Sequence, residues 1–136
     1  MLIVDDQAPF RSAARALVGL LRGWQVVGEA ETGEDAVRLA AELAPDVVLM
    51  DINLPGRNGI ESTRDLLVVR PRAAVVLTST YAAADLPAGA GTCGAVGYVR
   101  KEELTPRLLR ELVSGSSGGT GMRPRTDVPA PGVEST

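Results

Sequence analysis

Val47-Val48-Leu49-Met50-Asp51 is the stretch of sequence that decides the fold. Four consecutive apolar residues, two of them β-branched, follow the turn-forming pair Pro45-Asp46 and precede a loop that contains Pro55 and Gly56. This pattern predicts a short strand buried on both faces, which is typical of the middle of a parallel sheet covered by helices. Ligands of such sheets bind at the carboxyl ends of the strands, so Asp51 is expected to stand in a functional site.

The composition predicts one soluble domain. At 136 residues the chain can bury about two thirds of its extended surface, and a second domain does not fit. The net charge of −3 and the isoelectric point near 5.0 argue against a surface that binds nucleic acid. The sequence has no histidine, which excludes Ser-His triads and histidine-ligated metal sites.

The expected compartment is the cytoplasm, without membrane contact. Cys93 is the only cysteine, so an internal disulfide is excluded and a reducing compartment is the simplest one. No apolar run approaches the roughly 20 residues that a spanning helix needs. Asp5-Asp6 interrupts the first apolar run directly after Val4, so no signal peptide is expected.

Strand and helix patterns alternate along the whole chain. Short apolar runs predict strands over residues 2–4, 24–30, 47–51, 73–78 and 98–100. Apolar residues at helical spacing predict helices that end near residues 21, 43, 70 and 113, with start signals at Pro9, Thr32, Asn58 and Thr105. The glycine-rich stretch before the last strand predicts at most two helical turns, beginning near Pro87. The alternation predicts a doubly wound α/β fold with a five-stranded parallel sheet.

Polar side chains are expected to converge where the strands end. Four strands end respectively in Asp5-Asp6, Asp51, Thr78 and Lys101, and the ends of parallel strands lie on one edge of a sheet. Three carboxylates held together repel one another and raise one another's pKa unless a cation sits among them. Mg²⁺, a hard ion that prefers oxygen ligands, suits such a group better than zinc does.

These groups are the parts needed to transfer a phosphoryl group. A metal and an ammonium neutralise the phosphoryl oxygens while a carboxylate attacks the phosphorus. We interpret Asp51 as the nucleophile, because it stands alone at a central strand end, and Asp5 with Asp6 as metal ligands. The backbone carbonyl of Asn53 is a further candidate ligand. Lys101, the only lysine beside thirteen arginines, supplies the point charge.

Four segments at these strand ends together resemble a known family. They are Leu2-Ile3-Val4-Asp5-Asp6, residues 48–56 with Asn58-Gly59, Leu77-Thr78-Ser79, and Gly97-Tyr98-Val99-Arg100-Lys101. Each segment alone is a weak signal, but four in the right order are a specific one. The chain thereby resembles the receiver domain of bacterial two-component response regulators, which implies a flavodoxin-like three-layer sandwich over residues 1–113. Residues 114–136 are mostly Gly, Ser, Pro and Thr, and we expect a disordered tail or a linker there.

The resemblance also implies a function. It implies a phosphoprotein for phosphorelay signalling that takes a phosphoryl group onto Asp51 from a sensor histidine kinase or a phosphotransfer protein, with Mg²⁺ held by Asp5, Asp6, Asp51 and the Asn53 carbonyl. Thr78 and Tyr98 would form the conformational switch, and Lys101 the paired cation. We expect a signalling protein with slow self-dephosphorylation rather than an enzyme. A dimer that depends on phosphorylation, and a DNA-binding domain beyond residue 136, are left open.

Two alternatives compete with this interpretation. One is a receiver-like binding module that is never phosphorylated, although the complete set of Asp5, Asp6, Asp51, Thr78 and Lys101 argues against it. The other is an aspartate-nucleophile phosphohydrolase. Such enzymes typically need a second aspartate two residues after the nucleophile as general acid, and this chain has Asn53 there.

Overall fold

The computed structural model describes residues 1–80 and 86–117 of the chain. Within them a parallel five-stranded sheet has the order β2-β1-β3-β4-β5. The strands are β1 (Leu2–Val4), β2 (Gly28–Ala30), β3 (Val47–Asp51), β4 (Ala74–Ser79) and β5 (Gly97–Arg100). The helices are α1 (Ala8–Val18), α2 (Gly33–Leu43), α3 (Gly59–Val69), the 3₁₀ helix η2 (Lys101–Glu103) and α4 (Pro106–Ser117).

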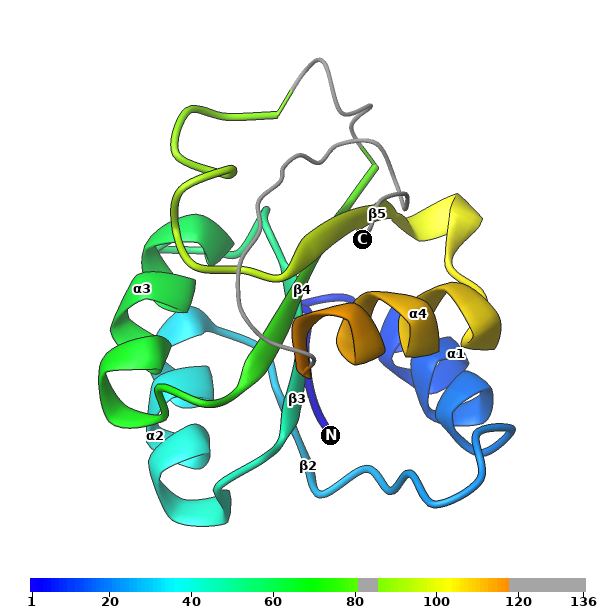
Figure 1. Ribbon diagram of the computed structural model, residues 1–136. Helices are drawn as coiled ribbons and strands as arrows, with labels where there is room; N and C mark the ends of the chain where they lie inside the picture. Colours follow the sequence, from blue (N-terminus) through cyan, green and yellow to red (C-terminus); the bar gives the residue numbers. More distant parts are fainter. Residues whose placement is uncertain (81–85, 118–136) are drawn as a thin grey trace.

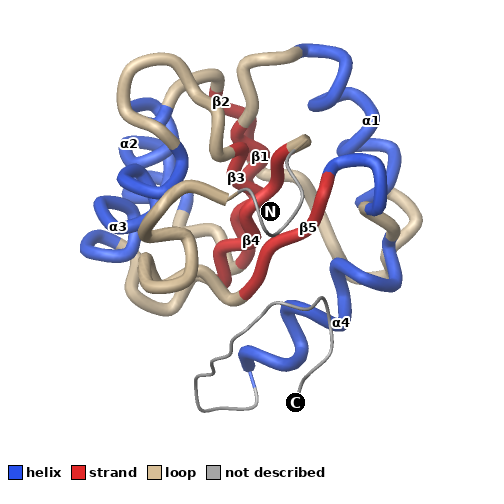
Figure 2. Tube along the Cα trace, turned by 90° about the horizontal axis from the view of Figure 1, so that it is seen from above, coloured by secondary structure: helices blue, strands red, loops and turns tan. Residues whose placement is uncertain are grey.

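Helices cover both faces of the sheet. Figure 1 shows α2 and α3 on one face and α1 and α4 on the other, and Figure 2 shows the strands running between these two layers. Alternate residues of β3 serve the two layers: Val48 and Met50 pack with α2 and α3, whereas Val47 and Leu49 pack with α1 and α4. This arrangement confirms the predicted flavodoxin-like, doubly wound sandwich. None of the described helices has the length and hydrophobicity needed to cross a bilayer.

The two helices of one layer begin at side-chain caps that the sequence predicts. The Thr32 hydroxyl accepts a hydrogen bond from the backbone N–H of Asp35 at 3.1 Å, at the start of α2. A full capping box opens α3, where Asn58 Oδ1 accepts the N–H of Glu61 at 2.9 Å and Glu61 Oε1 accepts the N–H of Asn58 at 3.3 Å. The second cap also fixes the end of the loop that leaves β3.

We expect Asn58→Ala to lower the free energy of unfolding by about 1 kcal/mol, because the Glu61 N–H loses its acceptor at the start of α3. Urea unfolding followed by far-ultraviolet circular dichroism measures the change. Asn58→Asp keeps an acceptor oxygen at the same place and serves as the control. Equal destabilisation by both substitutions would show that the cap is not what stabilises α3.

The predicted end of the first helix and the predicted start of the second strand are wrong. The spacing of apolar residues predicts a first helix that extends to Leu21, but α1 ends at Val18. The N–H groups of Leu20 and Leu21 bond to carbonyls only three residues back, so the chain tightens there and leaves Leu20 76% exposed. Of the predicted strand over residues 24–30, only Gly28–Ala30 forms β2, with Gly28 beside Leu2 of β1; before it, the Val27 N–H still donates to the Met1 carbonyl at 2.9 Å.

The glycine-rich stretch also differs from its prediction. Residues 86–96 form turns, where a short helix from Pro87 is expected; residues 81–85 lie outside the described part of the chain. Gly89 and Gly94 have φ angles of +91° and +102°, which a right-handed helix excludes. At the other end, α4 continues to Ser117 instead of ending at Val113. The predicted tail beyond Ser117 lies outside the described residues.

Candidate functional site

The carboxyl ends of β1, β3, β4 and β5 meet at one edge of the sheet, as the sequence predicts. The parallel register sets Val4 beside Met50, Asp51 beside Thr78, and Ser79 beside Arg100. The residues that follow β1 and β5 in the chain, Asp5 and Lys101, therefore reach the same place. The sheet brings together residues that are up to 96 positions apart in the sequence.

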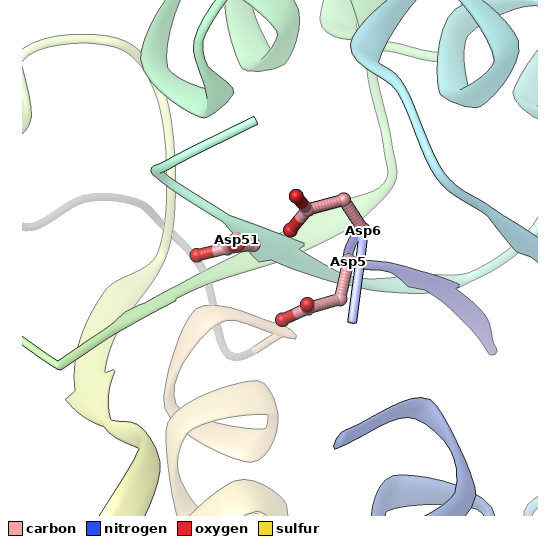
Figure 3. A group of neighbouring side chains, drawn as sticks. All are labelled: Asp5, Asp6 and Asp51. Carbon is pink, nitrogen blue, oxygen red and sulfur yellow. The ribbon is translucent and has the colours of Figure 1, made fainter. Parts of the chain in front are cut away.

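Three carboxylates form the centre of the site. Figure 3 shows Asp5 and Asp6 after β1 and Asp51 at the end of β3, with their side chains projecting to the same side. One oxygen from each of the three lies within 4.8 Å of the others. Asp5 is fully buried and Asp51 is 2% exposed, whereas Asp6 is open to solvent. A donor set of three carboxylates at this spacing suits a hard divalent cation.

Lys101 faces both buried carboxylates. Its Nζ lies 2.6 Å from Asp5 Oδ2 and 3.6 Å from Asp51 Oδ2, and its side chain is only 13% exposed. The ammonium also lies 4.6 Å from the centre of the Phe10 ring and 3.5 Å from Gln7 Oε1. Lys101 therefore neutralises part of the charge of Asp5 and Asp51 and is itself held by α1 and the residue before it.

Burial raises the pKa of Asp51 from 3.8 to about 6, and the negative charge of Asp5 adds to this rise. Lys101 and the backbone N–H of Asn53, which donates to Asp51 Oδ1 at 3.2 Å, act in the opposite direction. Asp6 raises the pKa slightly further. The carboxylate stays mostly ionised at pH 7, and a cation bound beside it would relieve the repulsion.

The candidate switch residues lie beside this cluster. Thr78 is fully buried, and its hydroxyl has no hydrogen-bond partner within the described residues. Tyr98 is partly buried against the core that contains α2 and α3. Burial raises the pKa of Tyr98, and a hydrogen bond with Ser79 partly offsets this. The neighbouring Ser79 thus has a partner in Tyr98, which leaves Thr78 as the free hydroxyl closest in register to Asp51.

The loop after β3 is fixed by a close approach of two backbones. The N–H of Gly59 donates to the carbonyl of Ile52 at 2.8 Å. A Cβ on Gly59 would lie 2.1 Å from the backbone oxygen of Asp51, so only glycine fits there. The carbonyl of Asn53 as a metal ligand stays a prediction, since only its N–H has a defined role here.

Sequence reasoning misses three residues of this site. Phe10 is assigned to the apolar stripe of the first helix, and its contact with Lys101 has no sequence signal. Gln7 follows the acidic pair directly; its N–H donates to Asp5 Oδ1 at 2.8 Å, so its position next to Asp5-Asp6 is the one available hint. Arg11 Nη1 donates to the backbone oxygen of Asp5 at 2.7 Å.

Comparison with known proteins agrees with this geometry. The family model described as response regulator receiver domain matches residues 1–113. The chain belongs to this family. Accepting a phosphoryl group is the general role of receiver domains in two-component systems.

The receiver is similar to both curated and structurally determined response regulators. It is 39% identical over 119 residues to the response regulator GacA of Pseudomonas aeruginosa, covering 85% of this chain and 55% of that protein. It is 35% identical over 118 residues to UvrY of Escherichia coli, covering 87% and 54%. The chain thus spans about half the length of these curated relatives.

Two solved structures illustrate the shared fold. A two-component response regulator of the LuxR family from an Aurantimonas species superposes with a TM-score of 0.75 at 32% identity, covering 84% of each chain. The response regulator domain of Thermotoga maritima CheB superposes with a TM-score of 0.72 at 31% identity, covering 83% of this chain and 92% of that one. Both matches support the sandwich described above.

Proposed function

We propose that this receiver domain accepts a phosphoryl group on Asp51 from a sensor histidine kinase or a phosphotransfer protein. The observation that carries the proposal is the buried carboxylate of Asp51 at the end of the central strand, with Lys101 at 3.6 Å and the carboxylates of Asp5 and Asp6 beside it. An ionised carboxylate with a positively charged group beside it is a suitable nucleophile for attack on phosphorus.

In the proposed transfer an oxygen of Asp51 forms a bond to the phosphorus of a phosphohistidine. The bond between that phosphorus and the imidazole nitrogen of the donor breaks, and the imidazole leaves with the electron pair and takes up a proton. The ammonium of Lys101, which contacts Asp51 before the reaction, is placed to pair with a phosphoryl oxygen afterward. Because the ammonium already lies between Asp5 and Asp51, it would need to move only a short way to reach a phosphoryl oxygen on Asp51.

Asp5, Asp6 and Asp51 are the residues that would hold Mg²⁺, with the backbone carbonyl of Asn53 as a further ligand. The spacing of the three carboxylates and the raised pKa of Asp51 both fit a cation in this place. When bound, Mg²⁺ supplies positive charge to the oxygens of the transferring group. The chain's own contribution is to keep two of the three carboxylates buried and oriented.

Thr78 and Tyr98 form the proposed switch. The Thr78 hydroxyl has no partner within the described residues, so a phosphoryl oxygen on Asp51 would offer it the missing acceptor. The phosphoryl group would interact more favourably with the conformation in which Thr78 points inward than with the one in which it does not. That difference would shift the population toward the inward conformation. Tyr98 would turn further inward together with the movement of Thr78 toward the phosphoryl group.

The receiver proper is proposed to comprise residues 1–113, in the cytoplasm; α4 continues to Ser117, and the residues after it are proposed to be a linker or tail. Relatives include a DNA-binding response regulator of the LuxR family from Staphylococcus aureus. We propose that any contact with nucleic acid belongs to a further domain, because this chain carries a net charge of −3. We propose that the receiver acts as a signalling protein with slow self-dephosphorylation.

Intact-mass measurement tests the proposed acceptor. The protein is incubated with acetyl phosphate, with and without Mg²⁺, beside the variant Asp51→Asn. We expect one phosphoryl adduct that requires Mg²⁺ and is lost in Asp51→Asn. Asp65→Asn, which removes an exposed carboxylate paired with Arg57, is the matched control and should keep the adduct. An adduct that persists in Asp51→Asn, or none in the natural chain even with a phosphorylated histidine-kinase donor, would contradict the proposal.

A further inference from the structure

We propose that Arg11 is a positioning residue for the metal site. In this inference, which rests on the proposed function, its guanidinium fixes the peptide between Asp5 and Asp6 and thereby aims both carboxylates toward Asp51. Arg11 would act through the backbone, without touching the metal or the phosphoryl group. Removing Arg11 should weaken cation binding even though all three aspartates are still present in the sequence.

The contacts of Arg11 tie α1 to two strand ends. Nη1 donates to the backbone oxygen of Asp5 at 2.7 Å, and Nε donates to Glu29 Oε1 at 3.0 Å. Nη2 lies 3.7 Å from Glu31 Oε2. The Arg11 side chain is 14% exposed, so these contacts are largely shielded from water. Because Glu29 belongs to β2, the guanidinium links the end of β1 to its neighbouring strand.

The bond to the Asp5 carbonyl completes the fixation of that residue. The N–H of Asp5 donates to the carbonyl of Ala30 at 3.0 Å, and Asp5 Oδ1 accepts the N–H of Gln7 at 2.8 Å. The carbonyl bonded by Arg11 belongs to the same peptide plane as the N–H of Asp6. A bond to this carbonyl restrains ψ of Asp5 and φ of Asp6, the backbone angles on either side of the peptide that joins the two acidic residues.

Arginine suits this role better than lysine. Its planar guanidinium directs several donors at once in a fixed geometry, whereas an ammonium is a single point charge. Here Nη1 and Nε serve partners on different segments, Asp5 and Glu29. Glu29 is held from a second side by Arg15, whose Nη1 lies 2.5 Å from Glu29 Oε2.

Arg15 provides a matched control within the same cluster. Arg11→Met and Arg15→Met each remove one positive charge from α1 and one ion pair with Glu29; of the two arginines, Arg11 alone bonds to the Asp5 carbonyl and also pairs with the exposed Glu31. Loss of a nearby positive charge alone would favour cation binding slightly. A weaker affinity in Arg11→Met therefore has the opposite sign to the charge effect and reports on orientation.

The test measures cation affinity directly, without phosphoryl transfer. Mg²⁺ affinity is obtained from the rise in the free energy of unfolding with Mg²⁺ concentration, and Mn²⁺ affinity from electron paramagnetic resonance of the free ion. We expect Arg11→Met to weaken both by about 10-fold or more, the usual size of effects through outer-sphere partners. Arg15→Met should stay within about 2-fold of the natural chain. Arg11→Lys, which keeps the charge, should weaken binding by about 3-fold or more.

The outcomes separate this inference from the proposed function. Unchanged affinity in Arg11→Met, or an equal loss in Arg15→Met, would overturn the role of Arg11 and leave the metal site intact. No cation binding in the natural chain would overturn both. If Arg11→Met does not fold, Arg11→Lys decides, because full affinity in that variant would contradict a need for the guanidinium geometry.

Discussion

Lys101→Met is expected to lower the free energy of unfolding by about 3 kcal/mol at pH 7 in metal-free buffer. The Lys101 ammonium lies 2.6 Å from Asp5 Oδ2 and 3.6 Å from Asp51 Oδ2, and both carboxylates are buried. Methionine keeps most of the side-chain volume but leaves two buried charges without their cation. Removing one partner of a buried ion pair costs about 3–5 kcal/mol, and the 13% exposure of Lys101 places the expected loss at the lower end.

Urea unfolding in the presence of a chelator measures this loss, and two comparisons identify its cause. Saturating Mg²⁺ should restore much of the stability, because the cation replaces the missing positive charge. Arg100→Met is the matched control: it removes the preceding cation, which pairs with the exposed Glu102 and Glu103, and should cost about 1 kcal/mol or less. Equal losses in both variants would show that Lys101 is an ordinary surface lysine.

The central strand and the groups at its end could be predicted from the sequence because their causes are local. The apolar run 47–50 is buried on both faces, and its pattern carries that information without reference to other segments. The parallel sheet then places all strand ends at one edge. Asp51, Thr78 and Lys101 could be grouped for this reason, although none is close to another in the chain.

The ends of the outer elements could not be predicted, because neighbouring segments decide them. Val27 belongs to an apolar run that suits a strand, but it is 41% exposed and precedes β2, although its N–H donates to the Met1 carbonyl at 2.9 Å. Leu43 has helical spacing with the inward residues of α2 and is 40% exposed, because it lies in the last turn, past the edge of the core. Where an outer strand or helix ends depends on the length of the segment that it pairs with or packs against. The spacing of apolar residues does not report that length.

The supporting contacts of the site were also beyond sequence reasoning. Arg11 bonds to Glu29, which is 18 positions away in the sequence. The ring of Phe10, in the first helix, contacts Lys101, which comes after the last strand. Each of these residues has an ordinary explanation in its own helix, as a solvent-facing charge or as part of an apolar stripe. Only the packing of α1 against the strand ends gives them a second role.

Asp51→Asn is expected to stabilise the metal-free protein near neutral pH. Burial first and the charge of Asp5 second raise the pKa of Asp51 from 3.8 to about 6. Between these two values the folded chain keeps a proton on Asp51 that the unfolded chain has lost, so stability falls as the pH rises through this window. Above pH 6 the full cost is present, about 3 kcal/mol for a shift of about two pKa units. Asparagine has no such charge.

The expected signature is a change with pH rather than a fixed offset. The free energy of unfolding of Asp51→Asn minus that of the natural chain should grow by about 2 kcal/mol between about pH 4 and pH 7.5. Mg²⁺ should reduce the difference, because it stabilises the natural chain. Asp46→Asn, which removes a carboxylate that is 96% exposed, is the control for losing one negative charge that is not buried. A constant difference for Asp51→Asn would contradict the cost of burying its charge.

The double variant Lys101→Met/Asp51→Asn joins the two expectations. With Asp51 neutral, the loss of the ammonium leaves one buried carboxylate, Asp5, instead of two. The destabilisation by Lys101→Met should therefore be smaller in the Asp51→Asn background, by about 1 kcal/mol or more, as for other side chains in contact. If the changes in the free energy of unfolding simply add in the double variant, Lys101 stabilises the charge of Asp5 alone. In that case Lys101 would have to move toward Asp51 in the proposed phosphoryl transfer without an existing attraction to guide it.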